Sequence, residues 1–525
     1  MDVSSLFALW HSPLVLLVTL LVPIFSFLIL FSTKKNRLPP SCSNGGQMLP
    51  PSPPGLPILG HLHLLGSLPH RKLRSLAEAH GPVMLLRFGR VPTVVASSAA
   101  AAQEAMKTRD LAFASRPQMR MAEKLLYGRD MVLAPYGEYW RQARRVCVAH
   151  LLSPRRILSF RRVREQEVAA LLGLVHNRSQ GGVVNLTDML TSYSNAVIKR
   201  AAFGDGDYGI EGDDSGEKLR KVLDNFEHML GTATVGEFVP WLAWLDTLTG
   251  LNAKVTRTFQ VLDELLERVI AGHRQRRLAG GHLVGDGEDD QRDFVDVLLD
   301  VNEAGEEAGG VRFDEVRIKA IMLDMFAAAT DTTFMVLERV MAELMNHPSE
   351  MRKLQNEIRA AVNGASRVTE GHLEQLHYLR AVIKETLRLH APLPLLLPRE
   401  TLEDTELLGY RVPARTRVVI NVWAIGRDPT TWERAEEFVP ERFGDGQEEY
   451  MLGQDFSLVP FGAGRRGCPG GGFAAPSMEL ALASLLYHFD WELPNGVSKV
   501  DMTEQFGISV RLKVPLHLVA KPWSP

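Results

Sequence analysis

Cysteine is scarce in this chain, and no cysteine pattern predicts a network of disulfides. The 525 residues include three cysteines, Cys42, Cys147 and Cys468. An odd and sparse count is atypical of a small secreted protein held together by disulfides, so we expect the folded part in a reducing compartment. Thiols in such a compartment are free for chemistry, which makes each cysteine a candidate ligand or nucleophile.

An excess of basic charge is also absent. Lys and Arg number 59 and Asp and Glu number 62, which gives a formal net charge of -3. Binding to nucleic acid relies on concentrated positive charge, so we predict no nucleic-acid partner. No Gly-x-Gly-x-x-Gly stretch follows a predicted strand, and no flavin-binding segment is recognisable. Electrons for a redox reaction would therefore have to come from another protein.

The N-terminal segment lacks charge altogether. Residues 3–33 contain no Asp, Glu, Lys or Arg, and the basic stretch KKNR follows at 34–37. The apolar run at 14–31, at about 1.5 Å per residue, roughly matches a bilayer core of about 30 Å. A cleaved signal peptide is the competing interpretation, but the run is long, no basic region precedes it and no Ala-x-Ala site ends it. We predict a single membrane anchor over 1–33, with the following residues on the cytosolic side.

Proline marks the boundary between this anchor and the rest of the chain. Residues 34–57 are predicted to form a basic, proline-rich hinge, with five prolines from Pro50 to Pro57. Such a segment is extended and not helical. No second stretch of this kind interrupts residues 58–525, which we predict to be one domain. Within it, the polar and glycine-rich segment 278–293 is expected to be a surface loop.

Helical periodicity dominates the domain. Apolar residues recur three or four positions apart over 373–387, as on one face of a helix. Strand-like patches are few and short, at 82–89, 93–98 and 416–423. The fold class is therefore predicted to be mainly α with a small β portion.

One predicted helix is unusually long. It runs from Asp314, a suitable N-cap, to about Asn346, before Pro348 ends it. About 33 residues make roughly 50 Å of helix, enough to cross the whole domain. Its centre reads AAATDTT (327–333). Close helix packing would explain the alanines, but not a buried acid such as Asp331 among apolar neighbours.

The stretch PFGAGRRGCPG (460–470) raises the question of what its thiol does. Glycines let a flat ligand approach the backbone, an arginine offers a fixed cation to a carboxylate, and a following helix favours a negative sulfur. A lone cysteine is more often a buried structural residue. Haem with an axial thiolate meets all three features. The spaced pattern F-x-x-G-x-R-x-C-x-G consists of Phe461, Gly464, Arg466, Cys468 and Gly470.

Two further motifs accompany this pattern. KETLRLH (384–390) contains an E-x-x-R pair, Glu385 and Arg388, and PERF (440–443) supplies Arg442. With them the chain resembles the haem-thiolate monooxygenases, the cytochromes P-450, from anchor to C-terminus. It resembles in particular the plant microsomal A-type enzymes of specialised metabolism. The resemblance implies the cytochrome P-450 fold, haem b (iron protoporphyrin IX) ligated by Cys468, and a charge cluster of these three residues behind the haem. A surface ion pair is the alternative for Glu385 and Arg388.

The resemblance also assigns residues around the cofactor. WRQAR (140–144) matches a W-x-x-x-R motif whose Trp140 and Arg144 would reach a haem propionate, although Trp140 could simply pack in the core. Arg399, in a strand expected after the E-x-x-R helix, is a third propionate candidate. Phe461 and Arg466 complete the predicted cofactor-binding set, and residues 58–525 become a haem-thiolate catalytic domain.

The long helix is similar to the family's oxygen-binding helix, [AG]-G-x-[DE]-T. Here Ala329 replaces the central glycine, which adds a methyl group to the pocket. The resemblance makes Asp331 and Thr332 the catalytic pair that relays protons. We expect activity to survive the replacement because the acid and the hydroxyl remain.

The activity implied is an NADPH- and O2-dependent monooxygenation of a small or medium hydrophobic plant metabolite, for instance an indolic or another defence-compound intermediate. Electrons would come from NADPH through a separate flavoprotein reductase. Both proteins would be in the endoplasmic reticulum membrane, this one single-pass with its catalytic domain facing the cytosol. Arg141 and Arg145 are candidates for the reductase contact, with plain solvated charge as the alternative. Family analogy assigns the substrate pocket to 115–135, 229–245, Phe326 with Ala327, 393–397 and 505–509.

Two rival functions remain at this point. An oxygen-independent dehydratase or isomerase would keep the fold, but such relatives tend to lack the acid–threonine pair. A non-catalytic haem sensor usually carries an output domain, and none is recognisable in the sequence.

Overall fold

The structure is a computed structural model. It describes residues 48–206, 222, 225–232, 234–279, 292–304, 313–444 and 455–524. The predicted membrane anchor, most of the predicted hinge and the centre of the glycine-rich segment lie outside these residues.

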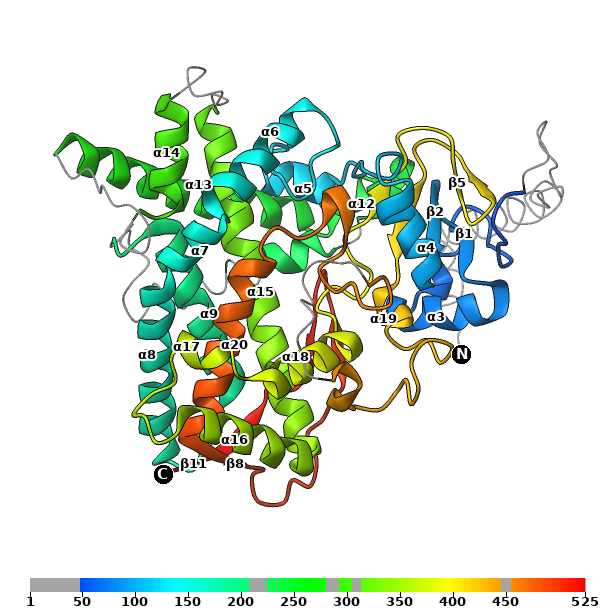
Figure 1. Cartoon of the computed structure of the whole chain (residues 1–525). Coiled ribbons are helices and arrows are strands. Elements are labelled where there is room, and N and C mark those ends of the chain that lie inside the picture. The colour runs from blue at the N-terminus through cyan, green and yellow to red at the C-terminus, as the bar shows by residue number, and fades with distance from the viewer. Residues whose placement is uncertain are drawn as a thin grey trace, which may run out of the picture.

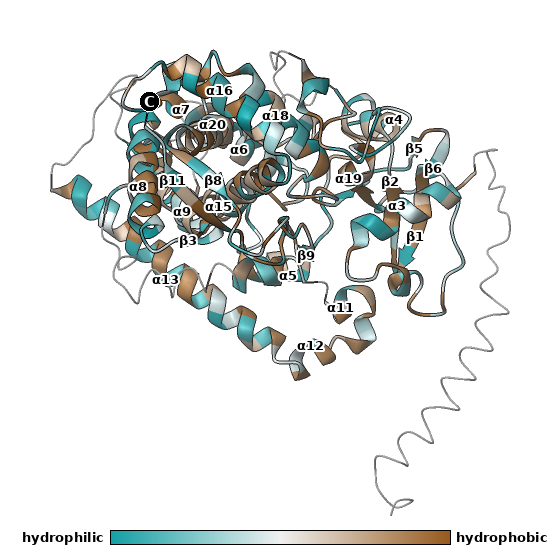
Figure 2. Cartoon of the chain, turned by 90° about the horizontal axis from the view of Figure 1, so that it is seen from below, coloured by the Kyte–Doolittle hydropathy of each residue, from teal (hydrophilic) through white to brown (hydrophobic). Residues whose placement is uncertain are grey.

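A long helix, α15 (Glu315–Asn346), occupies the centre of the fold. It packs against α9 (Leu186–Phe203), α18 (His377–Leu389) and α20 (Gly471–His488). Figure 1 shows these helices side by side, with the strands β1 and β2 set apart at the opposite end of the molecule. In the view from below, α15 is seen nearly end-on among its neighbours (Figure 2). The prediction of a mainly α fold with a small β portion is confirmed.

The other described helices line up along the chain with loops between them. Several begin with proline, whose missing N–H costs nothing in the first turn. The further α-helices are α3 (Pro69–His80), α4 (Ala99–Gln103), α5 (Arg120–Leu125), α6 (Glu138–Val146), α7 (Pro154–Ser159), α8 (Arg161–Ser179), α11 (Val235–Phe238), α12 (Leu245–Leu248), α13 (Leu251–Leu278), α14 (Phe294–Ala304), α16 (Pro348–Val362), α17 (Glu370–Leu373) and α19 (Val422–Ile425). Shorter turns are η1 (Leu62–Leu64), η2 (Glu104–Thr108), η3 (Cys147–Leu151), η4 (Pro240–Leu242), η7 (Pro440–Phe443) and η8 (Gly464–Arg466).

The largest described sheet contains all three predicted strand patches. Its order is β1-β2-β7-β4, with β1 antiparallel to β2 and β2 parallel to β7. The pairing of β4 with β7 brings Arg399 beside Val418. The strands of the fold are β1 (Val83–Phe88), β2 (Val91–Ala96), β3 (Val183–Asn185), β4 (Arg399–Glu400), β5 (Thr405–Leu407), β6 (Tyr410–Val412), β7 (Arg417–Ile420), β8 (Phe489–Glu492), β9 (Glu504–Phe506), β10 (Val510–Leu512) and β11 (His517–Pro522).

The ends of α15 follow the sequence signals. The carboxylate of Asp314 accepts a hydrogen bond from the backbone N–H of Arg317 at 2.9 Å, which caps the first turn. The helix ends at Asn346, two residues before Pro348 begins α16. Among the described helices, only α15 is long and apolar enough to cross a membrane, but 78% of its most apolar stretch is buried inside the protein. It is therefore a core helix, and the prediction of its limits is confirmed.

A buried ion pair joins α18 to the loop before η7. The Glu385 carboxylate accepts hydrogen bonds from Nε and Nη2 of Arg388 at 2.7 and 2.8 Å, and both side chains are fully buried. Arg442 donates to the same carboxylate at 3.1 Å. The backbone N–H of Val439 also donates to it, at 2.7 Å. Every charge in this group has partners. Because both side chains of the pair are fully buried, the surface ion pair considered above is excluded.

We predict that Arg388→Met destabilises the protein strongly. The substitution leaves the Glu385 carboxylate buried with one main partner removed, which typically costs about 3–5 kcal/mol. The matched control is Arg434→Met, because Arg434 and Glu437 have the same three-residue spacing but are more than half exposed. That change should cost only about 0–1 kcal/mol. The check is the urea midpoint of each variant, and equal midpoints would contradict the assigned role of the buried pair.

Candidate active site

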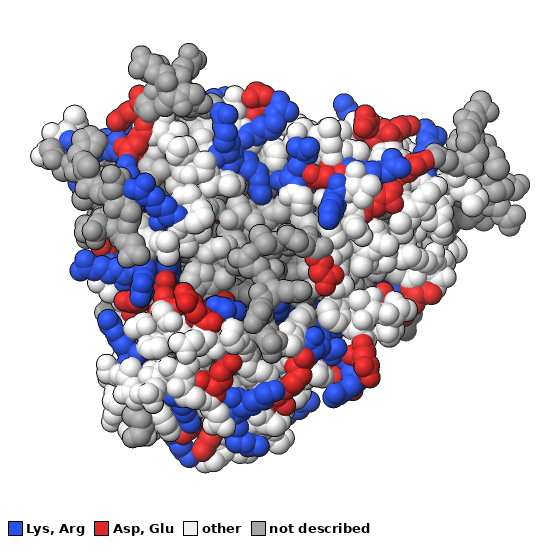
Figure 3. All heavy atoms as spheres, in the orientation of Figure 1, with Lys and Arg blue, Asp and Glu red and all other residues white. Residues whose placement is uncertain are grey.

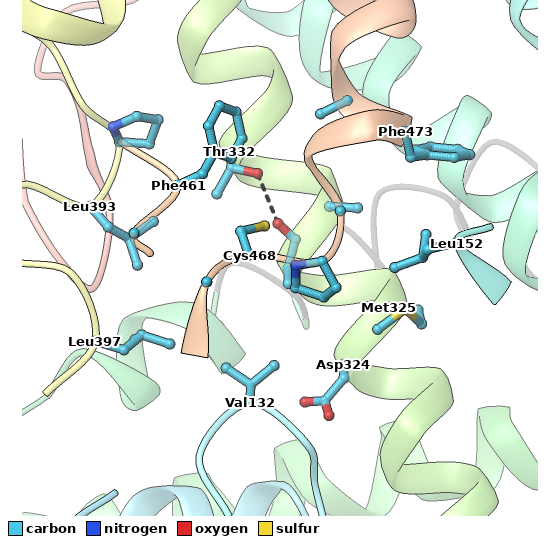
Figure 4. A pocket seen from close by; sticks show the side chains of 18 of the residues that line it. Val132, Leu152, Asp324, Met325, Thr332, Leu393, Leu397, Phe461, Cys468 and Phe473 are labelled. Carbon is cyan, nitrogen blue, oxygen red and sulfur yellow. Dashed lines mark hydrogen bonds between the residues drawn. The ribbon is translucent and has the colours of Figure 1, made fainter. Parts of the chain in front are cut away.

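The predicted cysteine, arginines and threonine meet around one internal cavity of about 230 Å³. Its walls come from the middle of α15, the start of α20, the loop before α6 and the segment between α18 and β4. In the close-up, Cys468 lies among Val132, Met325, Leu393 and other apolar side chains (Figure 4). The cavity therefore combines one thiol with a largely apolar wall.

The Cys468 thiol is presented to this cavity. Cys468 is an exposed residue although it lies deep inside the protein, because its free surface faces the cavity. Its backbone N–H donates to the carbonyl of Phe461 at 2.8 Å, which closes the loop before α20. Burial raises the pKa of the Cys468 thiol, whereas the backbone amides of Gly470 and Gly471 lower it. Burial is the largest effect, so the pKa of the thiol is raised on balance, while the amides at the helix start and the charge of Arg144 act in the direction of the thiolate.

Glycine is required at one position of the loop before the cysteine. Gly464 has a positive φ of 66°, and a Cβ built there would lie 2.0 Å from the carbonyl oxygen of Met106. No side chain fits without moving the backbone of η2. This close contact holds the Cys468 loop against the β-rich end of the molecule.

Four arginines line the same cavity. Arg116, Arg399 and Arg466 are buried, and Arg144 is half-buried. Backbone carbonyls hold most of them in place: Arg466 donates to Ala114 and Ala134, each at 2.7 Å.

These arginines outnumber the carboxylates near them: Arg399 lies 3.7 Å from Asp110, which also pairs with Arg465 at 3.2 Å. Burial lowers the pKa of Arg399 to about 10. Burial, reinforced by repulsion from Arg399 and Arg144, lowers the pKa of Arg466 to about 9. The Nη1 of Arg466 is buried and has no hydrogen-bond partner among the described residues. A guanidinium stays charged in proteins, so this arrangement calls for an anionic ligand in the cavity. The two carboxylates of a haem group would supply that charge.

Trp140 supports the arginines from behind. Its ring centroid lies 4.1 Å from the guanidinium carbon of Arg466. Its indole N–H donates to the carbonyl of Met131 at 3.0 Å, so this donor is already used by the protein. Arg144, one helical turn further along α6, donates to the carbonyl of Gly467 at 2.7 Å. Trp140 thus lies at the site by packing, while Arg144 is tied to the residue before Cys468.

On the opposite wall, only the threonine of the predicted acid–threonine pair of α15 lines the cavity. Thr332, Ala328 and Ala329 line the cavity, and the Thr332 hydroxyl donates to the Ala328 carbonyl at 2.9 Å (Figure 4). Asp331 is not among the lining residues. Its carboxylate instead forms an ion pair with Arg511 of β10 at 3.0 Å. This ion pair directs the Asp331 carboxylate towards β10, away from the cavity.

The predicted substrate-contacting segments are only partly present in this cavity. Residues from 115–135 and 393–397 line it, but 229–245 and 505–509 do not. Phe326 and Ala327 do not line it either, and Phe326 packs against Phe203 with ring centroids 5.0 Å apart.

Sequence reasoning missed Arg116. Its guanidinium donates to the carbonyls of Leu397 and Pro398 at 2.7 and 2.9 Å, which fixes the edge of the cavity. The one local signal was a charge two positions after the apolar stretch LAFA (111–114).

Comparison with known proteins agrees with this site. The sequence matches the family model described as Cytochrome P450 over residues 50–519. It is 48% identical to "Cytochrome P450 736A117" of Prunus mume over 90% of each chain. It is 45% identical to "Cytochrome P450 71A4" of Solanum melongena over the full length of both, and 44% identical to "Norfluorocurarine oxidase" of Strychnos sp over 94% and 96%.

A solved structure shares the fold. A zebra fish cytochrome P450 solved with progesterone superposes with a TM-score of 0.74 and 24% identity, and the match covers 86% of this chain and 99% of that one.

A cavity with a thiol at a helix start and an excess of buried arginines fits a haem-thiolate protein. The chain belongs to the cytochrome P450 family and is a haem-thiolate monooxygenase of the plant microsomal A-type. Members of this family use haem and receive electrons from a redox partner.

We predict that Arg466→Leu weakens haem retention. It removes one buried cation from the cavity, and hydrogen bonds to charged groups are worth about 1.5–3 kcal/mol, or roughly ten- to a hundredfold in affinity. Arg465→Leu is the matched control, since Arg465 is half-exposed and pairs with Asp110 at 3.2 Å. Haem transfer to apomyoglobin measures the difference. Equal transfer rates for both variants would contradict the role of Arg466.

Proposed function

We propose that this protein inserts one oxygen atom from O2 into a small or medium hydrophobic plant metabolite. The observation that carries the proposal is the Cys468 thiol sharing one cavity with Thr332. Apolar side chains such as Val132, Leu393 and Leu397 favour a substrate of low polarity. The relative named norfluorocurarine oxidase supports a specialised plant metabolite as substrate, and an indolic or other defence-compound intermediate belongs to this class.

Each residue has a definite task in this proposal. Cys468 would hold the haem iron, and Arg466, Arg144 and Arg399 would neutralise the haem carboxylates. The haem, when bound, supplies the activation of oxygen. Thr332 offers a hydroxyl in the cavity that can hand on a proton.

In this scheme Asp331 contributes without lining the cavity. Its ion pair with Arg511, whose side chain is 33% exposed, connects it to the solvent side. We assign Asp331 a positioning role and the proton transfer in the cavity to Thr332. Ala329, which lines the cavity, adds a methyl group there in place of the family's glycine, and the Thr332 hydroxyl remains.

NADPH is proposed as the electron source, through a separate flavoprotein reductase. Arg141 and Arg145 of α6 belong to its proposed contact surface, on the side of α6 away from the cavity. Lys and Arg side chains gather on the part of the surface where α6 lies (Figure 3). Arg141 also pairs with Glu138, which reduces its net charge there.

The test is turnover under 18O2. The anchored protein is combined with NADPH, a plant flavoprotein reductase and a panel of apolar plant metabolites. We expect a product that carries one 18O atom and forms only with NADPH and reductase present. A product without added oxygen, formed without NADPH, would favour the dehydratase or isomerase. Saturable ligand binding with no turnover of any compound would favour a haem sensor.

We predict that Thr332→Val uncouples NADPH consumption from product formation. The substitution keeps the shape and removes the hydroxyl, and loss of a proton-transfer group costs about 10²–10⁴-fold in rate. Thr330→Val is the control, because the Thr330 hydroxyl donates to the Phe326 carbonyl at 2.9 Å and does not line the cavity. Product formed per NADPH should fall in the first variant and stay near wild type in the second. The opposite order would contradict the role of Thr332.

We also propose that residues 1–33 anchor the protein in the endoplasmic reticulum membrane, followed by the hinge at 34–57 and the catalytic domain at 58–525. The apolar run and the basic stretch after it support a single pass with the domain in the cytosol.

Removal of residues 1–33 should shift the protein from membrane pellets towards the soluble fraction. Asn177 and Asn185, both in N-x-S/T sequons, should stay unglycosylated. A mobility shift with N-glycosidase would contradict the cytosolic orientation.

A further inference from the structure

Away from the cavity, three ligand-type side chains converge where α13 ends and α14 begins. His273 lies near the end of α13, Asp293 directly precedes α14 and Asp296 lies in its first turn. All three are buried, and one ligand atom of each lies within 4.8 Å of the other two. Neither the haem site nor the proposed reductase surface uses these residues.

The imidazole of His273 is held in one orientation. Its Nδ1 lies 2.7 Å from the carbonyl oxygen of Val269, and a carbonyl only accepts, so Nδ1 carries a proton. The other nitrogen, Nε2, points at the Oδ2 of Asp293 at 2.8 Å. A histidine whose Nδ1–H is bound to a backbone carbonyl is oriented as metal-ligating histidines are. A proton on Nε2 would be donated to the Asp293 carboxylate, and a bound metal ion would take the place of that proton.

The third side chain has an unused oxygen. Asp296 is 7% exposed, and its Oδ2 has no hydrogen-bond partner among the described residues. The Oδ1 of Asp293, by contrast, accepts a hydrogen bond from the backbone N–H of Asp296 at 2.9 Å, which caps α14. A buried carboxylate oxygen without a partner is costly, which indicates a group that the described residues do not supply.

Neighbouring arginines do not fill this role. Arg277 lies 3.7 Å from Oδ1 of Asp296, but it also pairs with Asp300 at 2.8 Å and Glu303 at 3.1 Å. Arg276 lies 3.8 Å from Asp293. Arg292 also pairs with Asp300, at 3.0 Å. The distances of 3.7 Å from Arg277 to Asp296 and 3.8 Å from Arg276 to Asp293 are too long for hydrogen bonds.

We propose that His273, Asp293 and Asp296 bind one zinc ion. One imidazole nitrogen and two carboxylate oxygens form a ligand set that zinc accepts, with water able to complete a tetrahedron. With metal–ligand bonds of about 2.0–2.2 Å, Nε2 and Oδ2 would move from 2.8 Å to roughly 3.3 Å apart. This change is small enough for side-chain rotation alone.

The proposed zinc site lies next to the wall of the haem cavity. Phe294, directly after Asp293, lines the haem cavity and packs against Phe160 and Phe473 with ring centroids 5.4 and 6.3 Å apart. Phe473 lies in the first turn of α20, after Cys468. A zinc ion there would clamp the α13–α14 junction against the wall of the cavity and stabilise the folded holoenzyme.

Zinc content of the haem-loaded, full-length protein in detergent tests this proposal. The protein is stripped with a chelator, given one equivalent of Zn²⁺, dialysed against metal-free buffer and analysed by elemental mass spectrometry. Wild type should retain one zinc per haem and gain thermal stability. Asp296→Asn, which keeps the side-chain volume and the Asp293 cap, should lower zinc affinity by about tenfold or more.

Asp300→Asn is the matched control, since it lies on the same helix and pairs with Arg277 but is not part of the cluster. It should retain zinc as wild type does. If Asp296→Asn fails to bind haem, His273→Gln replaces it as the test. A wild type that retains no zinc, or variants of Asp296 and His273 that retain as much as wild type, would overturn the proposal.

Discussion

An excess of positive charge inside the protein is the constraint on which the rest of the site depends. Arg116, Arg399 and Arg466 are withdrawn from water and fixed mainly by backbone carbonyls, and Arg399 has Asp110 at 3.7 Å as a carboxylate partner. Burial, and after it repulsion from Arg399 and Arg144, lowers the pKa of Arg466. An acidic, flat ligand that fills the cavity relieves this repulsion, so haem binding and folding of the cavity wall are expected to support each other.

The two long helices give this charged cavity its two chemical faces. α20 begins at Gly471, three residues after Cys468, and the amides of Gly470 and Gly471 point at the sulfur. α15 brings alanines and the Thr332 hydroxyl to the other face, where a bulkier residue would fill the space. The buried Glu385–Arg388 pair fixes α18 to the loop before η7, and α18 in turn packs beside α15 and leads into the segment that carries Leu393 and Leu397 into the cavity. Substrate choice and oxygen chemistry thus rest on the same helix packing.

The sequence predicted most of this arrangement because its signals were local. Asp314 and Pro348 define the ends of α15, and the spaced pattern around Cys468 indicates the axial thiolate. It did not predict contacts between residues that lie far apart in the sequence. The pairing of Asp331 with Arg511 joins residues 180 positions apart, and no local pattern could indicate it.

The same limit explains Trp140 and Arg116. The carbonyl that accepts from the Trp140 indole belongs to a loop that folds back over α6. Arg116 reaches its place only because the segment after α18 passes beside it. Both depend on irregular backbone, for which periodicity gives no information.

Axial ligation by Cys468 is the central claim, and a carbon monoxide difference spectrum tests it most directly. Wild type, Cys468→Ser and Cys147→Ser are reduced with dithionite and compared. Cys147 is the control because it is buried outside the cavity lining. The account predicts a Soret band at the long-wavelength position typical of thiolate ligation in wild type and Cys147→Ser, and its loss in Cys468→Ser. An unchanged band in Cys468→Ser, or a folded wild type that binds no haem, would contradict it.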